Sequence, residues 1–267
     1  MHIDIDAGPT LQTTFEAFRN EIDAFNDRRE RLIKTSRDVT ALSKKVIFHL
    51  HRFSFQAPWP ADDQDDTSSN TRLFEEAQKK LAEIESLLRA CADKEGLPSE
   101  PTRPNDTMLR CERFLGASLE EWIEAKSFLY FLQYNALIPY DVVQAALTSD
   151  TSMDVYVTPM RYLLGLSDLT GELMRFAINA VASIAPLQIM EHVLTMQRTI
   201  FHALEPLAPY HTEIRKKQQV TLTSLRKVED AAYTIRVRSA EYAHDPDMAQ
   251  GLIQRALASN EDVMPPS

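Results

Sequence analysis

Two pairs of acidic residues stand in unusually apolar parts of the chain. Glu121 and Glu124 are three residues apart, and Asp168 and Glu172 are four apart, so each pair shares one face of a helix. The turns after the first pair are rich in phenylalanine and leucine. A helix this apolar is mostly buried, and like charges one turn apart repel more strongly away from water. Positive charge must therefore offset the repulsion within each pair.

Two sources of positive charge are open. Between Met160 and Met190 the only other charged residues are Arg161 and Arg175, which could form structural ion pairs; Arg175 follows Glu172 by three residues. The alternative is a hard divalent cation, because magnesium and manganese prefer carboxylate oxygens. If the two helices pack together, four carboxylates converge, as in metal-assisted phosphodiester hydrolysis with a metal-bound water as the nucleophile. The residues alone leave both alternatives open.

Other residues point less clearly to chemistry. A di-iron centre expects ExxH motifs on paired helices, and neither acidic pair has one. His49 and His51 are interpreted as polar surface or interface residues of a helix rather than as ligands. The basic runs at 28–37 and 215–227 could meet phosphates, but a solvated helix face is the favoured interpretation of a short charge run.

Composition narrows the class of protein. The chain has 267 residues, and its six glycines are too few for a turn-rich β-fold or for phosphate loops. The net charge of −10 argues against autonomous, non-specific nucleic-acid binding. Two cysteines without a CxxC motif support neither a disulfide framework nor a zinc site. No signal peptide or membrane-spanning stretch is evident, so we expect an intracellular protein.

Helical periodicity dominates the remaining sequence. We predict an all-α fold of about seven helices without strands, in a single domain over 11–243 with a flexible N-terminus (1–10) and a flexible tail (244–267). An acidic loop (54–71) and a proline-rich linker (96–106) interrupt it. Ser118 fits a capping box and predicts a helix start. The expected helices cover 11–53, 72–92, a short stretch from 105 to 114, 118–136, 139–147, 156–184, 186–204 and 210–242.

Three blocks resemble the translin family, and within it the branch of translin-associated factor X. They are FRNEIDAFNDRRERLIKTSRDVTALSKKVIFHLHRF, GLSDLTGELMRFAINAV and SLRKVEDAAYTIRVRSAEY, and the resemblance spans about 12–242. It implies a seven-helix bundle with a long first helix and a barrel-like hetero-oligomer with translin. It also implies a Mg²⁺-dependent endoribonuclease, with Mn²⁺ as a substitute, in the cytoplasm and with the nucleus as a second location. The implied substrates are single-stranded RNA, namely passenger-strand fragments in RNA silencing or pre-tRNA fragments, and single-stranded DNA as a second candidate.

The resemblance also assigns roles to the acidic pairs. Glu121 and Glu124 match the family's E-x-x-E helix, and Asp168 and Glu172 match its D-L-T-G-E motif. Glu124 and Glu172 are then the expected magnesium ligands, and Glu121 and Asp168 complete the site or position the water. Lys126 stands where the family has a small apolar residue, and it either contacts a phosphate or pairs with an acidic neighbour.

Because the chain is acidic, we expect a more basic partner to supply the contacts with RNA phosphates. This chain alone is then expected to be weakly active or inactive. The alternative is a non-catalytic interaction partner that stabilises translin.

Overall fold

A computed structural model describes most of the chain as helix. It describes residues 11–55, 59, 70–96, 106–148, 155–183, 185–245, 248, 251–253 and 255. These residues form α1 (Leu11–Leu50), α2 (Thr71–Glu95), α3 (Asp106–Tyr134), α4 (Tyr140–Leu147), α5 (Pro159–Asn179), α6 (Pro186–Leu204) and α7 (Thr212–Glu241), with two short 3₁₀ helices, η1 (Ala180–Ala182) and η2 (Glu205–Leu207). None of the described residues lies in a strand, so the predicted all-α class is confirmed.

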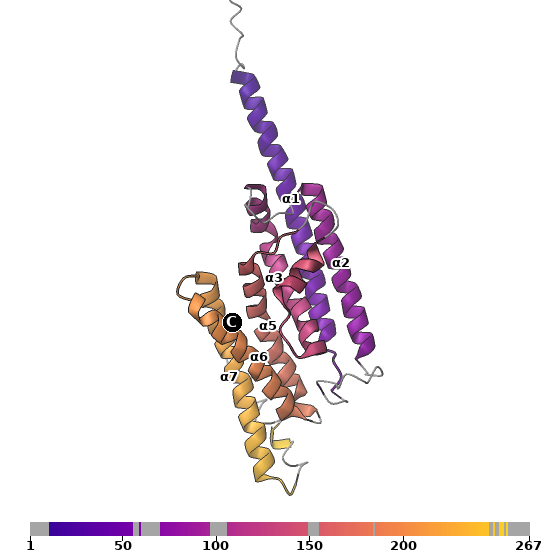
Figure 1. Cartoon of the computed structure of the whole chain (residues 1–267), viewed down its shortest axis with the longest axis vertical. Coiled ribbons are helices and arrows are strands. Elements are labelled where there is room, and N and C mark those ends of the chain that lie inside the picture. Colours follow the sequence, from indigo (N-terminus) through magenta and orange to yellow (C-terminus); the bar gives the residue numbers. More distant parts are fainter. Residues whose placement is uncertain are drawn as a thin grey trace, which may run out of the picture.

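The helices form an elongated bundle along one axis (Figure 1). On one side α1 packs against α2 and α3, and on the other α5 packs against α6 and α7. Contacts between α3 and α5 join the two sides. Large aromatic side chains fill the interior near this junction, among them Trp122, Phe128, Phe131 and Phe176. Within the described part of the chain, no helix has the length and hydropathy that a membrane crossing requires.

Several helix ends follow from local sequence. Gly96 ends α2 in the left-handed conformation, with φ of 63°, which glycine adopts without a side-chain penalty. Thr158 caps α5, because its hydroxyl accepts the backbone N–H of Arg161 at 3.3 Å, and Pro159 follows at the first helical position. Pro186 opens α6, whose observed limits are those predicted.

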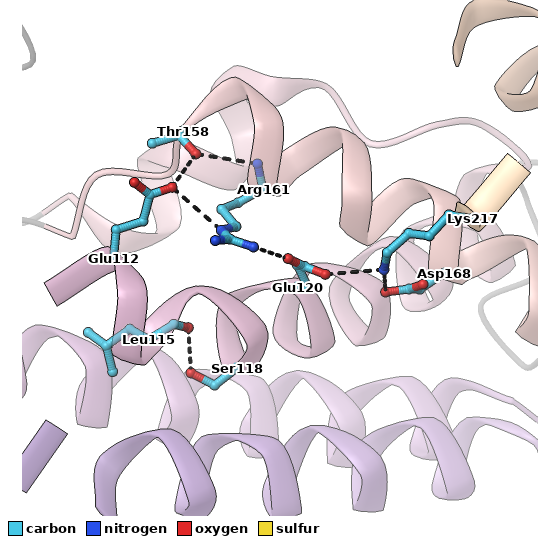
Figure 2. Close-up of polar contacts among 8 residues, drawn as sticks. All are labelled: Glu112, Leu115, Ser118, Glu120, Thr158, Arg161, Asp168 and Lys217. Carbon is cyan, nitrogen blue, oxygen red and sulfur yellow. Dashed lines mark hydrogen bonds and ion pairs between the residues drawn. The ribbon is translucent and has the colours of Figure 1, made fainter. Parts of the chain in front are cut away.

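The predicted helix start at Ser118 is wrong. Residues 106–134 form one continuous helix, and the Ser118 hydroxyl donates to the Leu115 carbonyl at 2.7 Å instead of capping an N-terminus (Figure 2). Leu115 and Leu119 are both buried, so packing on either side of Ser118 favours a helix that runs through. Pro139 likewise precedes α4 as its cap rather than forming its first turn.

The segments predicted as loops and tails lie mainly outside the described residues. This applies to 1–10, to most of the acidic loop (54–71), to most of the proline-rich linker (96–106) and to most of 244–267. The single domain and its flexible ends therefore stay predictions.

The N-terminal end of α1 extends beyond the neighbouring helices (Figure 1), and α1 pairs with α2 from Arg28, which contacts Glu95 at 3.1 Å. The N-terminal end carries a row of exposed apolar side chains, which we call the N-terminal stripe: Leu11, Phe15, Phe18, Ile22 and Phe25. Their spacing alternates between four and three residues, as in the seam of a coiled coil. The same heptad register continues into the bundle, where Leu32, Val39 and Val46 are buried.

A close helix crossing joins the two sides of the bundle. A Cβ atom at Gly165 of α5 would lie 2.7 Å from the side chain of Ile123 and 3.1 Å from the backbone oxygen of Glu120, both on α3. Glycine is therefore required for α3 and α5 to approach this closely. The crossing lies beside both acidic pairs along the chain.

We expect Gly165→Ala to destabilise the protein by about 2 kcal/mol, because the added methyl group overpacks the crossing. Gly171→Ala on the same helix is the matched control, since a Cβ atom there meets nothing within 4 Å. That change should be neutral or stabilise by up to ~1 kcal/mol through helix propensity. Urea unfolding of both variants measures the difference, and equal midpoints would contradict a sterically tight crossing.

Candidate functional site

The α3–α5 crossing brings the two acidic pairs close enough to influence one another. Glu124 of α3 is only 9% exposed. Burial and the negative charges of Asp168, Glu172 and Glu121 together raise the pKa of Glu124 to about 9. The Glu124 carboxyl group therefore carries a proton at neutral pH in the absence of further positive charge.

Unlike its acidic neighbours, Glu124 has no direct partner among the residues that the structure describes. Across the described residues, none donates a hydrogen bond to its carboxyl group or pairs with it at contact distance. Glu121, one turn earlier, forms an ion pair of 3.3 Å with Lys44 of α1. Lys44 is mostly exposed, so water screens this pair. A buried, unpaired carboxyl group beside three others is costly unless it is protonated or meets a cation.

The imidazole of His51 and the guanidinium group of Arg175 both contact Glu172. The Nε2 atom of His51 lies 2.5 Å from Glu172 Oε2, and Arg175 donates to the same oxygen at 3.1 Å. The His51 ring also packs against Phe128, with ring centroids 4.9 Å apart. His51 was expected at the surface as a polar residue, but its side chain is only 9% exposed. It follows the buried Ile47 by four residues, and this helical spacing was the available signal.

A chain of polar contacts begins at Asp168 and runs through Lys217 and Glu120 to Arg161 (Figure 2). Lys217 of α7 donates to Asp168 at 2.5 Å and to Glu120 of α3 at 3.1 Å. Arg161 of α5 donates to the other oxygen of Glu120 and lies 3.5 Å from Glu112. Burial raises the pKa of Asp168, and the pairing with Lys217 offsets this only in part.

These contacts revise the expected partners. Arg175 pairs with Glu172, as the structural alternative required, but the ion pairs of Arg161 are with Glu120 and Glu112 instead of either candidate carboxylate. Lys217 was assigned to a solvated helix face, yet it faces the site.

The helical periodicity of α7 indicates that Lys217 points inward. Lys217 lies three residues after Ile214 and four before Thr221, both of which are buried, so it belongs to the inward face.

Lys126 pairs with an acidic neighbour. Its ammonium group lies 2.7 Å from Glu85 of α2 and 5.6 Å from the centroid of the Trp122 ring. The expected pairing of Lys126 with an acidic neighbour is therefore present in the structure.

Hard carboxylate oxygens around the unpaired Glu124 suit a magnesium-type cation in their chemistry. Within the described ranges, however, no three histidine, cysteine or acidic side chains are arranged to hold a metal ion. The contacts explain why: the carboxylates of Glu121, Asp168 and Glu172 each turn toward a cation of the protein. The donor set therefore fits a divalent cation, provided that some of these ion pairs open.

A model of the translin family matches residues 27–239. The chain belongs to the translin family. Translin-associated protein X of Pongo abelii is 30% identical over 261 residues, which cover 89% of this chain and 82% of the relative. The Schizosaccharomyces pombe homologue is 28% identical over 237 residues, which cover 86% of this chain and 90% of the relative.

Two solved structures share the fold of this translin-family chain. The crystal structure of apo-NeC3PO matches with a TM-score of 0.57 and 14% identity, over 81% of this chain and 94% of that one. The crystal structure of AfC3PO matches with a TM-score of 0.51 and 20% identity, over 82% and 95%. The translin-like helical bundle is thereby confirmed, and the family relationship supports a role in translin-type oligomers.

We expect Glu124→Gln to stabilise the cation-free protein at about pH 8 by up to about 5 kcal/mol, with little effect at about pH 4. The ordinary pKa of a glutamate is 4.5 and that of folded Glu124 is about 9. Between these values the folded state holds a proton that the unfolded state has lost, so the free energy of unfolding falls as pH rises. Urea unfolding in EDTA across this range measures the slope, which glutamine should reduce.

Glu121→Gln is the matched control for this titration. Its ion pair with Lys44 is largely solvated, so its effect should stay within about 0.5 kcal/mol at either pH. Parallel pH profiles for the wild type and Glu124→Gln would contradict the assigned pKa of Glu124.

Proposed function

We propose that this chain is the catalytic subunit of a Mg²⁺-dependent endoribonuclease that cleaves single-stranded RNA in a complex with a translin-type partner. One observation carries the proposal: Glu124 is buried and unpaired among the described residues, and three further carboxylates surround it. Family membership and the C3PO structural neighbours support the partner role. The endoribonuclease activity itself is what the resemblance to translin-associated factor X implies for these carboxylates.

Glu124 and Glu172 are the proposed ligands of the cation, Mg²⁺ or Mn²⁺, and Glu121 and Asp168 complete the acidic surroundings. The cation would neutralise charge on the scissile phosphate and lower the pKa of a water molecule. His51 holds one oxygen of Glu172 and leaves the carboxylate's other oxygen free of described partners. Glu124 must lose its proton to take part, so raising the pH toward 9 favours cation binding.

RNA binding is assigned mainly to the partner. The chain carries a net charge of −10, and its cations near the site are already engaged with carboxylates. A more basic partner would supply the phosphate contacts, so we expect this chain to be weakly active alone. The proposed substrates are passenger-strand fragments or pre-tRNA fragments, with single-stranded DNA as a second ligand, in the cytoplasm and also the nucleus.

A non-catalytic role as a stabilising partner of translin is the second candidate. It is favoured by the ion pairs that already engage three of the four carboxylates with side-chain cations. In that role the acidic groups would serve only to orient α1, α5 and α7 against α3.

An assay of RNA cleavage by the co-purified complex distinguishes the catalytic role from the stabilising role. We expect Mg²⁺-dependent cleavage of single-stranded RNA that EDTA abolishes and that Glu124→Gln/Glu172→Gln lowers at least a hundredfold, in a complex of unchanged size. Glu75→Gln/Glu83→Gln makes the same charge change on exposed positions of α2 and should retain full activity. An intact complex without cleavage under any condition would leave the stabilising role.

The N-terminal stripe is the proposed site where the translin-type partner contributes a helix. An alternating four–three row of apolar side chains is the pattern that packs against another α-helix, and a row this long is rarely left in water. Because the stripe shares its register with the buried part of α1, the partner would extend the helical packing already present in the bundle.

Phe18→Glu should therefore weaken co-purification of the partner at least tenfold while leaving the helix content and melting temperature of this chain unchanged. Asn20→Glu places the same charge on the opposite, polar face of α1 and is the matched control. Size-exclusion chromatography with light scattering measures the assembly. Normal assembly of the Phe18 variant would exclude the stripe as the partner's docking site.

A further inference from the structure

Lys217 is shared between carboxylates on two different helices. Its ammonium group contacts Asp168 of α5 at 2.5 Å and Glu120 of α3 at 3.1 Å (Figure 2). Burial alone would lower the pKa of Lys217, but the hydrogen bonds and charges of Asp168 and Glu120 outweigh burial and raise it. The group therefore carries a full positive charge between two acceptors.

Glu120 is held in place independently of Lys217. Arg161 donates to one Glu120 oxygen, and Lys217 binds the other. A Cβ atom at Gly116 would lie 2.6 Å from the Arg161 guanidinium carbon, so the Arg161 guanidinium group packs directly against α3 at Gly116. Arg161 also stands in the first turn of α5, where Thr158 caps its backbone N–H. Glu120 thus stays available as an acceptor whatever Lys217 does.

Asp168, by contrast, depends on Lys217. Among the described residues, Lys217 is the sole group that forms an ion pair with Asp168. The Asp168 side chain is 33% exposed, so an ion from solution can reach it. If Asp168 helps the proposed ligands Glu124 and Glu172 to hold a divalent cation, that cation and the Lys217 ammonium group would compete for the same carboxylate and repel each other.

We propose that Lys217 is an internal counter-ion of the carboxylate site, which competes with the divalent cation for Asp168 and retreats to Glu120 when the cation binds. The lysine stem is flexible and its ammonium group is a compact, rotatable donor, so one acceptor can replace the other without movement of α7. This inference rests on the proposed function, because it assumes that Asp168 helps to hold a cation. No step of RNA cleavage is needed for it.

Cation affinity tests the competition without any measurement of cleavage. Mn²⁺ titrations followed by electron paramagnetic resonance, on the full chain in its complex at constant pH, give the dissociation constant. Lys217→Met removes the charge and keeps much of the stem, so we expect about tenfold tighter Mn²⁺ binding. Lys217→Arg keeps the charge and should bind within about twofold of the wild type.

Lys216→Met is the matched control, because it removes the same charge from the adjacent, exposed position of α7. Solvent and salt screen that position, so the Mn²⁺ affinity should change by less than about twofold. If Lys217→Met does not assemble, Lys217→Gln keeps a hydrogen-bond donor for Asp168 and is expected to give the same increase. Mn²⁺ affinity that is unchanged or weaker in the folded, neutral Lys217 variant would overturn the proposal and leave Lys217 as a structural residue.

Failure of the site itself gives a different result. If the wild type binds no Mn²⁺, or if Glu124→Gln binds it as tightly as the wild type, the proposed cation site is wrong. The proposed competition between Lys217 and the cation is then excluded as well. If wild-type binding depends on Glu124 but not on the charge at Lys217, only the counter-ion role is excluded.

Discussion

Burying carboxylates between α3 and α5 costs free energy, and the packing at the centre of this bundle depends on how that cost is offset. Gly165 lets the two helices approach until Ile123 and the backbone of Glu120 leave no room for a methyl group. At that separation, burial and then the repulsion between the acidic side chains raise the pKa of Glu124. Every helix that packs around the crossing must therefore supply either apolar surface or positive charge.

The protein meets this demand with different kinds of positive charge. A proton neutralises Glu124, imidazole and guanidinium groups contact Glu172, and an ammonium group contacts Asp168. Structural ion pairing and cation binding are consequently not exclusive interpretations of the same acidic pairs. The ion pairs stabilise the free protein, and exchanging part of them for a divalent cation would keep the local charge balanced.

Much of this architecture follows from helical periodicity, and the exceptions have physical causes. Proline at the first turn and apolar spacing predict 186–204 correctly, because both act locally. The capping pattern at Ser118 fails because buried leucines on either side make a continuous helix more favourable than a new start. Both acidic pairs are identifiable from their apolar neighbours as carboxylates in a largely buried setting, as the burial of Glu124 shows. Lys217 and His51 are harder to identify, because each lies in a polar stretch of sequence that does not itself indicate a buried position. Only the helical spacing from buried residues shows that their side chains point inward.

The positions of the balancing groups along the chain bear on the order of folding. His51 precedes Glu172 by 121 residues, and Lys217 follows Asp168 by 49. Because α7 is the last of the long helices to be synthesised, a nascent chain that has completed α5 holds its acidic cluster without the ammonium group of Lys217. Until α7 is present, Asp168 lacks the described ion-pair partner that offsets its burial in the complete chain.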